Sequence, residues 1–509
     1  MPILEVAREC SALSDPSVLP LISQVSTDRL PESYQSDAAY AVLNMVGRVI
    51  AEGFPPGSPW FQLVLPARVQ NDPAVPPEQL HELNRWLMLM ELIVQGTLET
   101  AGLKPEDQRR PGGFLSQKRK SITQLLVTGD TLERLDSDYR LRVFRRDQYV
   151  TKRDSNGDVL YHATKEMVDP LGLDSDAVSA SGLDLHTLAD MPVTDRMVPL
   201  FTNIEWQPVS KVWLIEQEIN GRIVNDSEES VSPYFATPFK LAPDEDYGRG
   251  MVELYLGCIR SLNTLHKRRL EILGIMSRVV PAIDHGSPTR ERDLTQPTGK
   301  PIRARVRQGV IEDIAFLGYG NIAEHTSLVQ GIEDMSRKLA LAFLVESASS
   351  RDAERVTAFE RRRNAMEING ALGGMYTTIM DHQHLPLLRR CIQQLRKDRA
   401  LPPIPSTMFE VRSLTGLNSV IRESKAAALL EFAQVAGLLG PEAAARIDTG
   451  VLLDTYLRYR SLYEPGLVKS KQQLAQERQQ AINAQAQQDA NTQMIETAGR
   501  LIESGAVGA

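Results

Sequence analysis

Residues 247–281, YGRGMVELYLGCIRSLNTLHKRRLEILGIMSRVVP, decide how the rest of the chain is interpreted. Apolar side chains recur in this stretch every three or four residues, which is the spacing of one face of an α-helix. The stripe consists of Met251, Leu254, Tyr255, Cys258, Ile259, Leu262, Leu265, Ile272, Met276 and Val279, and Arg260, His266, Lys267, Arg268 and Arg269 lie largely away from it. The pattern predicts one amphipathic helix, about 40 Å long at a rise of about 1.5 Å per residue, that ends at Pro281.

Two more helices are predicted further along the chain. Residues 322–345 have a buried side made of Leu328, Val329, Ile332, Met335, Leu339 and Phe343. The third helix runs from Ala358 past Ile379, is interrupted by glycines at 370, 373 and 374, and is kinked by Pro386. Residues 347–357, SASSRDAERVT, separate these two helices and are too polar to continue either stripe. Long helices joined by a charged loop are typical of a mechanical part rather than of a catalytic pocket.

The insert between the first two helices is rich in proline and glycine. Within it, residues 302–307 alternate apolar and basic side chains, which predicts a strand with Arg303, Arg305 and Arg307 on one face. Such a basic stripe can meet DNA phosphates or an acidic partner. It can equally be the charged edge of a sheet that resists pairing with another sheet.

The remaining segments predict a mixture of helices and antiparallel strands. The chain to about Lys120 is mostly helical, and Trp86, Leu87, Met90, Ile93 and Val94 mark residues 78–98 as a core helix. From Leu125 to about Val224, short alternating runs predict strands, with hairpins at Asn156-Gly157 and Asn220-Gly221. Phe409 and Val411 lie in a predicted strand, helices follow over 419–439 and 442–463, and the Gln/Ala-rich residues 470–493 form an exposed helix or a mobile tail.

Composition and charge restrict the class of function. The length of 509 residues allows roughly three domains. The formal net charge of −8 repels nucleic acid, so we expect any DNA contact to be local or weak. Cys10, Cys258 and Cys391 lie far apart and are expected to be buried thiols in a reducing compartment. Neither a signal peptide nor a membrane span is recognised, which predicts a soluble protein synthesised in the cytoplasm.

A search for catalytic motifs gives no support for an enzyme. Thr298-Gly299-Lys300 is followed by Pro301 instead of the Ser or Thr of a phosphate loop. His382 and His384 are two residues apart, whereas metal-binding pairs on a helix use a spacing of four. The acidic residues 244–246 could bind a metal, but at the start of a helix such carboxylates more often cap it. We therefore expect no catalytic residues, no metal and no cofactor.

Several short strings resemble one family of proteins when they are taken together. They are Asp246-Tyr247-Gly248-Arg249, Leu254, Arg260-Ser261-Leu262, Glu354-Arg355-Val356-Thr357-Ala358, Leu372-Gly373-Gly374, Leu385-Pro386-Leu387 and Leu125-Leu126-Val127-Thr128-Gly129, with a weaker likeness over 148–157. In order and spacing they resemble the head-to-tail connector, or portal, proteins of short-tailed, podovirus-type bacteriophages. The likeness covers about residues 44–405, and the two ends match only in general character.

The resemblance implies an α+β, mainly helical portal fold with wing, stem, clip and crown regions. The implied boundaries are wing 1–246, first stem helix 247–280, clip 281–320, second stem helix 321–346, tunnel loop 347–357, long wing helix 358–404, and crown with C-terminal tail 405–509. The implied DNA-channel residues of the tunnel loop are Arg351, Asp352, Glu354 and Arg355, and the implied motor-contact residues of the clip are Arg303, Arg305 and Arg307. A solvated loop of self-paired charges is the alternative for the first group.

The resemblance also implies the assembly and its partners. A dodecameric ring would occupy one vertex of the capsid in the virion, as the channel for packaging and ejection of double-stranded DNA. The implied partners are further copies of the chain, the viral DNA, the terminase packaging motor, the major capsid and scaffolding proteins and the tail adaptor proteins, without a membrane. The apolar stripes support this reading, because neighbouring subunits would cover what one helix pair leaves open. The alternatives are a helical virion scaffold or adaptor without a central hole, and a DNA-processing enzyme.

Overall fold

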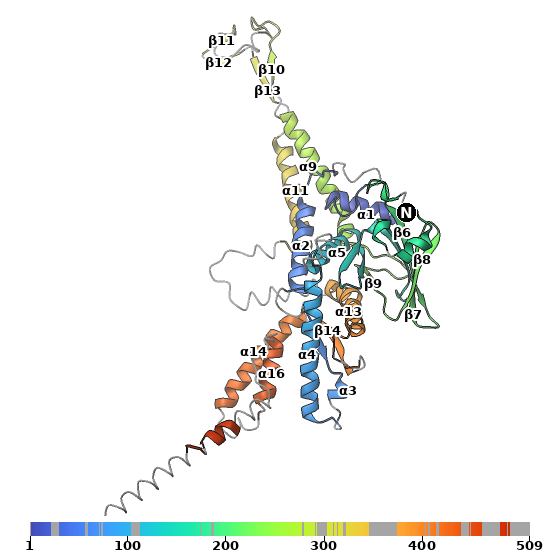
Figure 1. Ribbon diagram of the computed structural model, residues 1–509. Coiled ribbons are helices and arrows are strands. Elements are labelled where there is room, and N and C mark those ends of the chain that lie inside the picture. Colours follow the sequence, from blue (N-terminus) through green and yellow to red (C-terminus); the bar gives the residue numbers. More distant parts are fainter. Residues whose placement is uncertain are drawn as a thin grey trace, which may run out of the picture. The chain divides into compact units, whose positions relative to one another are not determined.

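The described part of the chain falls into two compact units, residues 1–419 and 420–509. The computed structural model (Figure 1) describes residues 2–21, 30–55, 60–70, 72, 75–102, 112–173, 175–184, 188–276, 279–290, 292, 303–308, 310–312, 314–318, 322–345, 374–402, 404–405, 408–413, 417–438, 447, 449–460, 479–485 and 487–488.

The first unit combines helices with small antiparallel sheets, in agreement with the predicted α+β, mainly helical class. Its helices are α1 (Pro2–Leu13), α2 (Asp37–Gly53), α3 (Ala67–Gln70), α4 (Pro77–Thr100), α5 (Phe114–Thr128), α6 (Ser175–Ser181), α8 (Met251–Leu254), α9 (Leu256–Met276), α11 (Ile322–Ala342) and α13 (Leu385–Lys397). Short turns of other helix types are η2 (Arg146–Gln148), η3 (Pro170–Gly172) and the π-helix η5 (Met380–His384).

The strands of the first unit pair in an antiparallel manner throughout its described part. They are β1 (Phe61–Val64), β2 (Asp130–Leu135), β3 (Leu141–Phe144), β4 (Tyr149–Arg153), β5 (Val159–Val168), β6 (Val198–Gln207), β7 (Val212–Ile219), β8 (Arg222–Glu229), β9 (Tyr234–Pro238), β10 (Val279–Ile283), β11 (Val306–Arg307), β12 (Val310–Ile311), β13 (Ile314–Gly318) and β14 (Glu410–Ser413). The sheet orders are β4-β5-β6-β7-β8, β3-β2-β9, β1-β14, β10-β13 and β11-β12.

Both predicted hairpins are confirmed, although their turns differ. Between β7 and β8, Asn220 and Gly221 have φ of +52° and +75°, as a two-residue turn of mirror-image type requires. Between β4 and β5, only Gly157 has a positive φ, of +87°. There the N–H of Gly157 donates to the carbonyl of Asp154, which forms a longer turn that does not need a left-handed conformation at Asn156.

The five-stranded sheet has one covered and one open face. A small core joins it to the three-stranded sheet, and its members are Leu132, Phe144, Tyr149, Ile204, Ile215, Tyr234 and Ala236. Because side chains alternate along a strand, the residues between these core positions on β5–β8 project to the opposite face.

The strand region begins later than the sequence predicted. Leu125–Thr128 form the last turn of α5, and the helix ends at Gly129, whose φ is +84°. Leu125, Leu126 and Val127 are all buried, since this end of α5 is surrounded by the core. A short run of adjacent apolar residues does not distinguish a buried strand from a buried helix, which explains the error.

The main core lies among α2, α4, α5, α9, α11 and α13. Leu87, Met90 and Val94 of α4 are fully buried in it, as predicted. Trp86 was expected beside them but is 47% exposed, because the buried stripe runs through Leu83 and Leu87 and Trp86 lies one position off it. The core also takes in Cys10 and Cys391, and Cys258 packs against it; none of the three forms a disulfide, which confirms the expected thiols.

The first long helix ends earlier than predicted. It is divided into α8 and α9, and α9 stops at Met276, so that Pro281 lies inside strand β10 rather than at a helix end. Proline can occupy this strand because each strand of a two-stranded ribbon has one unpaired edge, where a missing N–H is tolerated. The β-branched pair Val279-Val280 favours the extended conformation that a helical period did not reveal.

The C-terminal part of the first unit returns to its N-terminal part. Strand β14 pairs with β1, with Val411 opposite Leu63, so the predicted strand at Val411 is confirmed and belongs to the first unit. Of the predicted third helix, residues 358–373 lie outside the described residues. The described part runs helically from 374, passes through the π-helix η5 and continues as α13 across Pro386.

The second unit is described only in part. Helix α14 (Leu417–Leu438) enters it from the first unit, and α16 (Thr449–Arg460) follows, so both predicted helices are present. Within the Gln/Ala-rich segment, residues 479–485 are helical and exposed, in agreement with one of its two predicted states. Helix α14 has exposed apolar side chains at Phe432, Val435 and Leu438.

Candidate functional site

Helices α9 and α11, called here the helix pair, are covered on their facing sides. Ile259 and Leu262 of α9 are fully buried, and Ile332 and Leu339 of α11 are buried as well. Phe343, just after α11, is buried with its ring centroid 5.8 Å from that of Tyr255. The predicted stripe of α11 is therefore confirmed, and that of α9 is confirmed at Ile259 and Leu262. Leu254 and Tyr255 are exposed, and Val279 lies in strand β10, so the stripe is wrong at these three positions.

Outside this packed contact, the helix pair carries further apolar side chains that are exposed in the described chain. They are Leu270, Leu273 and Ile275 on α9, with exposed fractions of 56%, 39% and 50%, and Leu341 on α11 with 56%. The three on α9 lie beyond the part of that helix that is buried in the core, whereas Leu341 lies at the opposite end of the helix pair, one position before the end of α11. Water-exposed leucines at helical spacing indicate a contact surface for another polypeptide.

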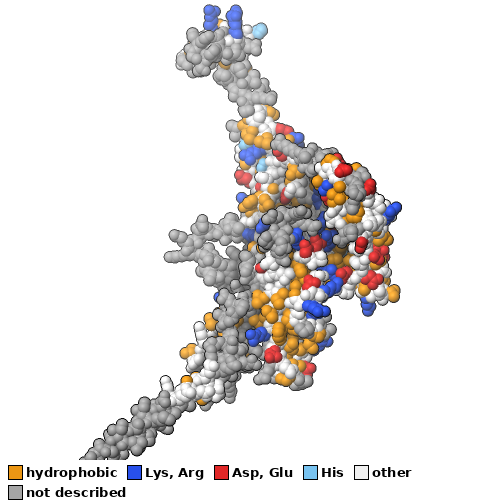
Figure 2. Space-filling model, in the orientation of Figure 1, with side chains coloured by type: hydrophobic (Ala, Val, Ile, Leu, Met, Phe, Trp, Pro, Cys, Tyr) orange, Lys and Arg blue, Asp and Glu red, His pale blue; other side chains and the backbone are white. Residues whose placement is uncertain are grey.

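The insert between α9 and α11 contains two short ribbons, β10–β13 and β11–β12. Arg303, Arg305 and Arg307 are exposed, but only Arg307 lies in a strand, so the predicted strand over 302–307 is wrong for Arg303 and Arg305. The carbonyl of Arg303 accepts a hydrogen bond from Thr289, and that of Arg305 from the N–H of Glu312. Figure 2 shows basic side chains at the end of the insert where β11 and β12 lie.

The predicted tunnel loop lies outside the described residues. Arg351, Asp352, Glu354 and Arg355 all fall within residues 346–373. Their role stays a prediction from the sequence.

The base of the helix pair is a close contact between two backbone segments that are far apart in sequence. Gly129, at the end of α5, meets the loop of Gly248 and Gly250 that leads into α8. A Cβ atom at Gly248 would lie 2.6 Å from the carbonyl oxygen of Gly129, and one at Gly250 would lie 2.8 Å from that of Leu126. Only glycine allows these backbones to approach so closely. The strings 125–129 and 246–249, which both carried the resemblance, thus form one junction.

A buried carboxylate organises the polar groups beside this junction. Asp130 is fully buried and accepts hydrogen bonds from the Tyr149 hydroxyl at 3.0 Å and from the Gly248 N–H at 3.4 Å. Burial raises the pKa of Asp130 to about 6, although Arg146 and Arg153 act to lower it. The guanidinium of Arg146 also lies 3.9 Å from the centre of the Tyr247 ring, a cation–π contact. These contacts fix the loop that positions α8.

The acidic residues 244–246 neither cap a helix nor gather around a metal position. Helix α8 begins after Gly250, without a side-chain cap. Asp246 accepts hydrogen bonds from Lys152 Nζ at 3.0 Å and from the N–H of Arg153 at 2.9 Å, and Glu245 pairs with Arg249 at 2.7 Å. The expected capping role was wrong because the loop has to reach strand β4 before it turns into the helix.

A second buried charge cluster, which the sequence pattern did not predict, lies around Lys118. Lys118 and Glu133 have no exposed surface and pair at 2.6 Å, and Lys118 lies 3.5 Å from the side-chain oxygen of Gln383 in the π-helix. Burial lowers the pKa of Lys118, although Glu133 acts to raise it. Next to Gln383, His384 is buried between Phe54 and Trp60, with ring centroids 4.7 and 4.8 Å away. Its ring nitrogens have no hydrogen-bond partner among the described residues, and burial holds its pKa well below the ordinary value.

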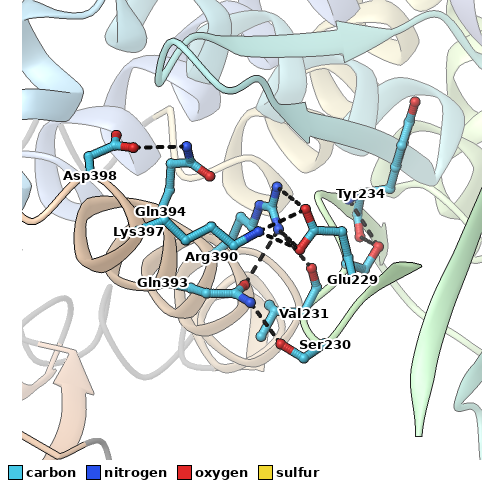
Figure 3. Close-up of polar contacts among 10 residues, drawn as sticks. Glu229, Ser230, Val231, Tyr234, Arg390, Gln393, Gln394, Lys397 and Asp398 are labelled. Atoms are coloured by element: carbon cyan, nitrogen blue, oxygen red, sulfur yellow. Dashed lines mark hydrogen bonds and ion pairs between the residues drawn. The ribbon is translucent and has the colours of Figure 1, made fainter. Parts of the chain in front are cut away.

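Helix α13 is fastened to the sheet by the polar contacts shown in Figure 3. Glu229, at the end of β8, pairs with Arg390 at 2.9 Å and with Lys397 at 3.0 Å. Gln393 donates to the Ser230 hydroxyl at 2.7 Å. Although burial acts to raise it, hydrogen bonds from Arg390 and Lys397 lower the pKa of Glu229. This latch joins the sheet to the helix that follows the undescribed segment.

None of these clusters has the arrangement of a reaction centre. Within the described residues, no three His, Cys, Asp or Glu side chains converge on a position that could hold a metal ion. Burial raises the pKa of the Cys10 and Cys391 thiols to about 12, which removes the thiolate form that reacts. No helix in the described part is long and apolar enough to cross a membrane. What the geometry offers is a jointed scaffold with an open apolar surface.

Comparison with known proteins identifies that scaffold. The family model described as "Bacteriophage head to tail connecting protein" matches residues 4–462. The chain belongs to this family of connecting proteins. It is 26% identical over 429 residues to the portal protein of Escherichia phage T7, covering 82% of this chain and 76% of that one. It is 25% identical over 504 residues to the portal protein of Enterobacteria phage SP6, covering 96% and 91%.

A solved structure titled "Neck of empty GTA particle computed with C6 symmetry" also matches this connecting protein. The sequence identity is 14% and the TM-score 0.36, with 78% of this chain and 86% of that chain covered. A similarity this low supports no conclusion about details. The family match covers the glycine junction, the helix pair and the insert, which are the features that the resemblance in sequence first connected.

Proposed function

We propose that this connecting protein is a portal subunit, whose copies close into a ring at one vertex of the capsid through which double-stranded DNA enters and leaves. The observation that carries the proposal is the set of exposed apolar side chains on the helix pair, at Leu270, Leu273, Ile275 and Leu341. One helix pair cannot cover itself on all sides, and a neighbouring copy in a closed ring supplies the missing surface. The portal proteins of phages T7 and SP6 support it by similarity, and we expect a ring of twelve.

In this proposal, the regions follow the boundaries expected from the sequence, except that the first stem helix ends at Met276. Helices α8, α9 and α11 are the stem, and the insert between α9 and α11 is the clip. The clip presents Arg303, Arg305 and Arg307 to the packaging motor, and all three are exposed as that contact requires. ATP hydrolysis belongs to the motor, since this chain offers no phosphate loop. The capsid, scaffolding and tail adaptor proteins are the other partners of the ring.

The charge of the chain suits a channel through which DNA slides. Each neutralised phosphate strengthens binding by releasing counterions, so a strongly basic channel would hold the genome in place. A chain with net charge −8 and few local basic groups keeps that contact weak. In the tunnel loop, Arg351 and Arg355 would touch the DNA backbone transiently, and Asp352 and Glu354 would limit the grip.

Replacement of the two loop arginines tests this role. We expect the double variant Arg351→Ala and Arg355→Ala to assemble normally, because the loop projects into the channel rather than between subunits. Retention of packaged DNA should change, which can be measured as the fraction of filled particles. Loss of the ring in this variant would show that the loop is structural instead.

Electron microscopy of the purified protein tests the ring itself. Negative-stain images and native mass spectrometry should show a closed ring with a central hole and a single subunit number. Particles without a hole would support the alternative of a helical scaffold or adaptor protein. ATPase and nuclease assays on the same preparation address the enzyme alternative, and activity that copurifies with the chain would overturn the proposal.

A further inference from the structure

The open face of the five-stranded sheet is strongly acidic over strands β6–β8. In the observed register, Glu205, Glu216, Glu218, Asp226 and Glu228 all project from this face. Four of them are exposed and Glu216 is half-buried. Exposed apolar side chains lie among them, with Ile223 and Phe201 paired on either side of Glu218. Figure 2 shows acidic side chains at the margin of the molecule where β7 and β8 lie.

These carboxylates differ from the others nearby because they have no cationic partner. Glu229, on the covered face of the same strand β8, pairs with Arg390 and Lys397. None of the five residues on the open face forms an ion pair with any described residue, and Glu216 receives only a 3.4 Å hydrogen bond from Asn203. Glu133, Glu166 and Glu229 on nearby strands all form ion pairs, whereas the five carboxylates of the open face do not.

The arrangement is also unfavourable for the isolated chain. Glu216 of β7 lies directly opposite Asp226 of β8, and like charges in such cross-strand pairs destabilise a sheet. Glu205 lies opposite Tyr161, and burial together with this carboxylate raises the pKa of the phenol. A cationic group bound over this face would reduce the repulsion between the carboxylates and so stabilise the sheet.

The kind of molecule that binds this face can be inferred by excluding those that its charge disfavours. A nucleic acid would be repelled by five carboxylates. A metal ion is not favoured, because within the described residues no three acidic side chains converge on one point. On this face Lys152 already pairs with Asp246, and Lys165 lies with its Nζ 5.7 Å from the centre of the Phe201 ring. One lysine cannot balance five carboxylates, so most of the matching charge has to come from elsewhere.

We propose that the open face of β6–β8 docks a Lys- and Arg-bearing segment of a different protein, whose apolar side chains contact Ile223 and Phe201. This deepens the proposed function, since a connecting protein needs surfaces for proteins other than its own copies. The sheet face is distinct from the exposed apolar side chains of the helix pair. Docking on the sheet and association of subunits through the helix pair can therefore be tested separately.

A charge-neutral triple variant tests the docking surface. Glu216→Gln, Glu218→Gln and Asp226→Asn are combined in the full-length protein. Glu82→Gln, Asp190→Asn and Glu431→Gln form a control with the same change in net charge at exposed carboxylates elsewhere. The probe is a fluorescein-labelled peptide of repeated Ala-Lys-Arg triplets, with Ala-Gln-Gln repeats as the neutral probe. Fluorescence anisotropy at low and high salt measures binding, and analytical ultracentrifugation measures assembly.

The expected result is specific to the sheet face. Wild type and control should bind the basic peptide equally, and the triple variant about fivefold to tenfold more weakly, as expected for loss of a few exposed ion pairs. Its melting temperature should rise, because the repulsion between Glu216 and Asp226 is removed. Equal binding by triple variant and control, or no binding by wild type, would overturn the proposal.

Assembly separates this inference from the proposed function. A triple variant that loses only its oligomeric state would show that the occupant is a second copy of the chain, which contradicts the proposal. Normal peptide binding by a wild-type protein that forms no ring would leave the docking surface in place while the portal proposal fails.

Discussion

At the scale of single residues, two kinds of buried position hold this chain in shape. Glycines 129, 248 and 250 allow two backbones to touch, and buried polar groups such as Asp130 and Lys118 hold the neighbouring segments together. His384 is the exception, since it is buried in an aromatic cage without a hydrogen-bond partner in the described part of the chain. Substitutions at the glycines test the backbone geometry, and substitutions at the buried polar groups test their polar interactions.

Gly129→Ala should destabilise the protein strongly. Gly129 has φ of +84°, and an added Cβ would collide with the backbone of Gly248 and Gly250, so we expect a loss of more than about 2 kcal/mol in unfolding free energy. Gly96→Ala is the matched control, because it has open space inside helix α4 and should stabilise by about 0.5–1 kcal/mol. Denaturant unfolding measures both, and equal effects of the two changes would argue against the junction.

His384→Phe should stabilise the protein, by about 1 kcal/mol, because a buried polar group without a partner is removed from an aromatic cage. The pKa of His384 in the fold lies well below its unfolded value of about 6.5. Below about pH 6.5 the unfolded chain binds a proton at this histidine and the folded chain does not. The free energy of unfolding therefore decreases as the pH falls below that value. Thermal unfolding from pH 7 to pH 5 should show a shallower decline for the variant than for wild type. A steeper decline would contradict this account.

At the scale of elements, the sequence predicted the helices and hairpins better than their ends. The stripes of α9 and α11 and the turn at Asn220-Gly221 depend on local periodicity and on positive φ, which a sequence displays directly. The helix end at Met276 and the strand at Pro281 depend on pairing with β13, more than thirty positions downstream, which periodicity does not contain. The sequence showed the arginines of the insert, whereas the Lys118–Glu133 pair and the latch arise only when distant segments meet.

Arg390→Ala should loosen α13 from the sheet. It leaves Glu229 with only Lys397 at the latch, so we expect a loss of about 1–3 kcal/mol in unfolding free energy, as for a partly buried hydrogen-bonded charge. The pKa of Glu229 is lowered in the fold, so the latch contributes above the ordinary value of about 4.5 and is lost as the pH falls below it. Hydrogen exchange along residues 385–397 should increase in the variant at pH 7. Lys211→Ala, at an exposed turn, is the control and should leave this exchange unchanged.

At the scale of the whole molecule, the exposed apolar side chains of the helix pair suggest that a single copy is not the functional assembly. These side chains are exposed in one copy, and the proposed ring would bury them between copies. The acidic sheet face would remain available to another protein. Assembly and docking should therefore respond to different substitutions.

The double variant Leu270→Lys and Leu273→Lys should prevent ring formation without unfolding the subunit. Both side chains are exposed in the single chain, so its far-UV circular dichroism should be unchanged, whereas burying two ammonium groups at a subunit contact is strongly unfavourable. Val209→Lys is the matched control, because Val209 is 97% exposed in the turn after β6. Analytical ultracentrifugation should show monomers only for the double variant. If this variant still formed rings, the helix pair would not be the contact between subunits.

The pairing of β1 with β14 also has a consequence for synthesis on the ribosome. Val64 lies opposite Glu410, so the first strand of the chain waits for its neighbour until almost 350 further residues have been translated. At typical elongation rates of about 5–20 residues per second, that delay is roughly 20–70 s. During this interval a nascent chain carries a free strand edge beside an unfinished core, and a chaperone that covers the edge in that window would raise the yield of competent subunits.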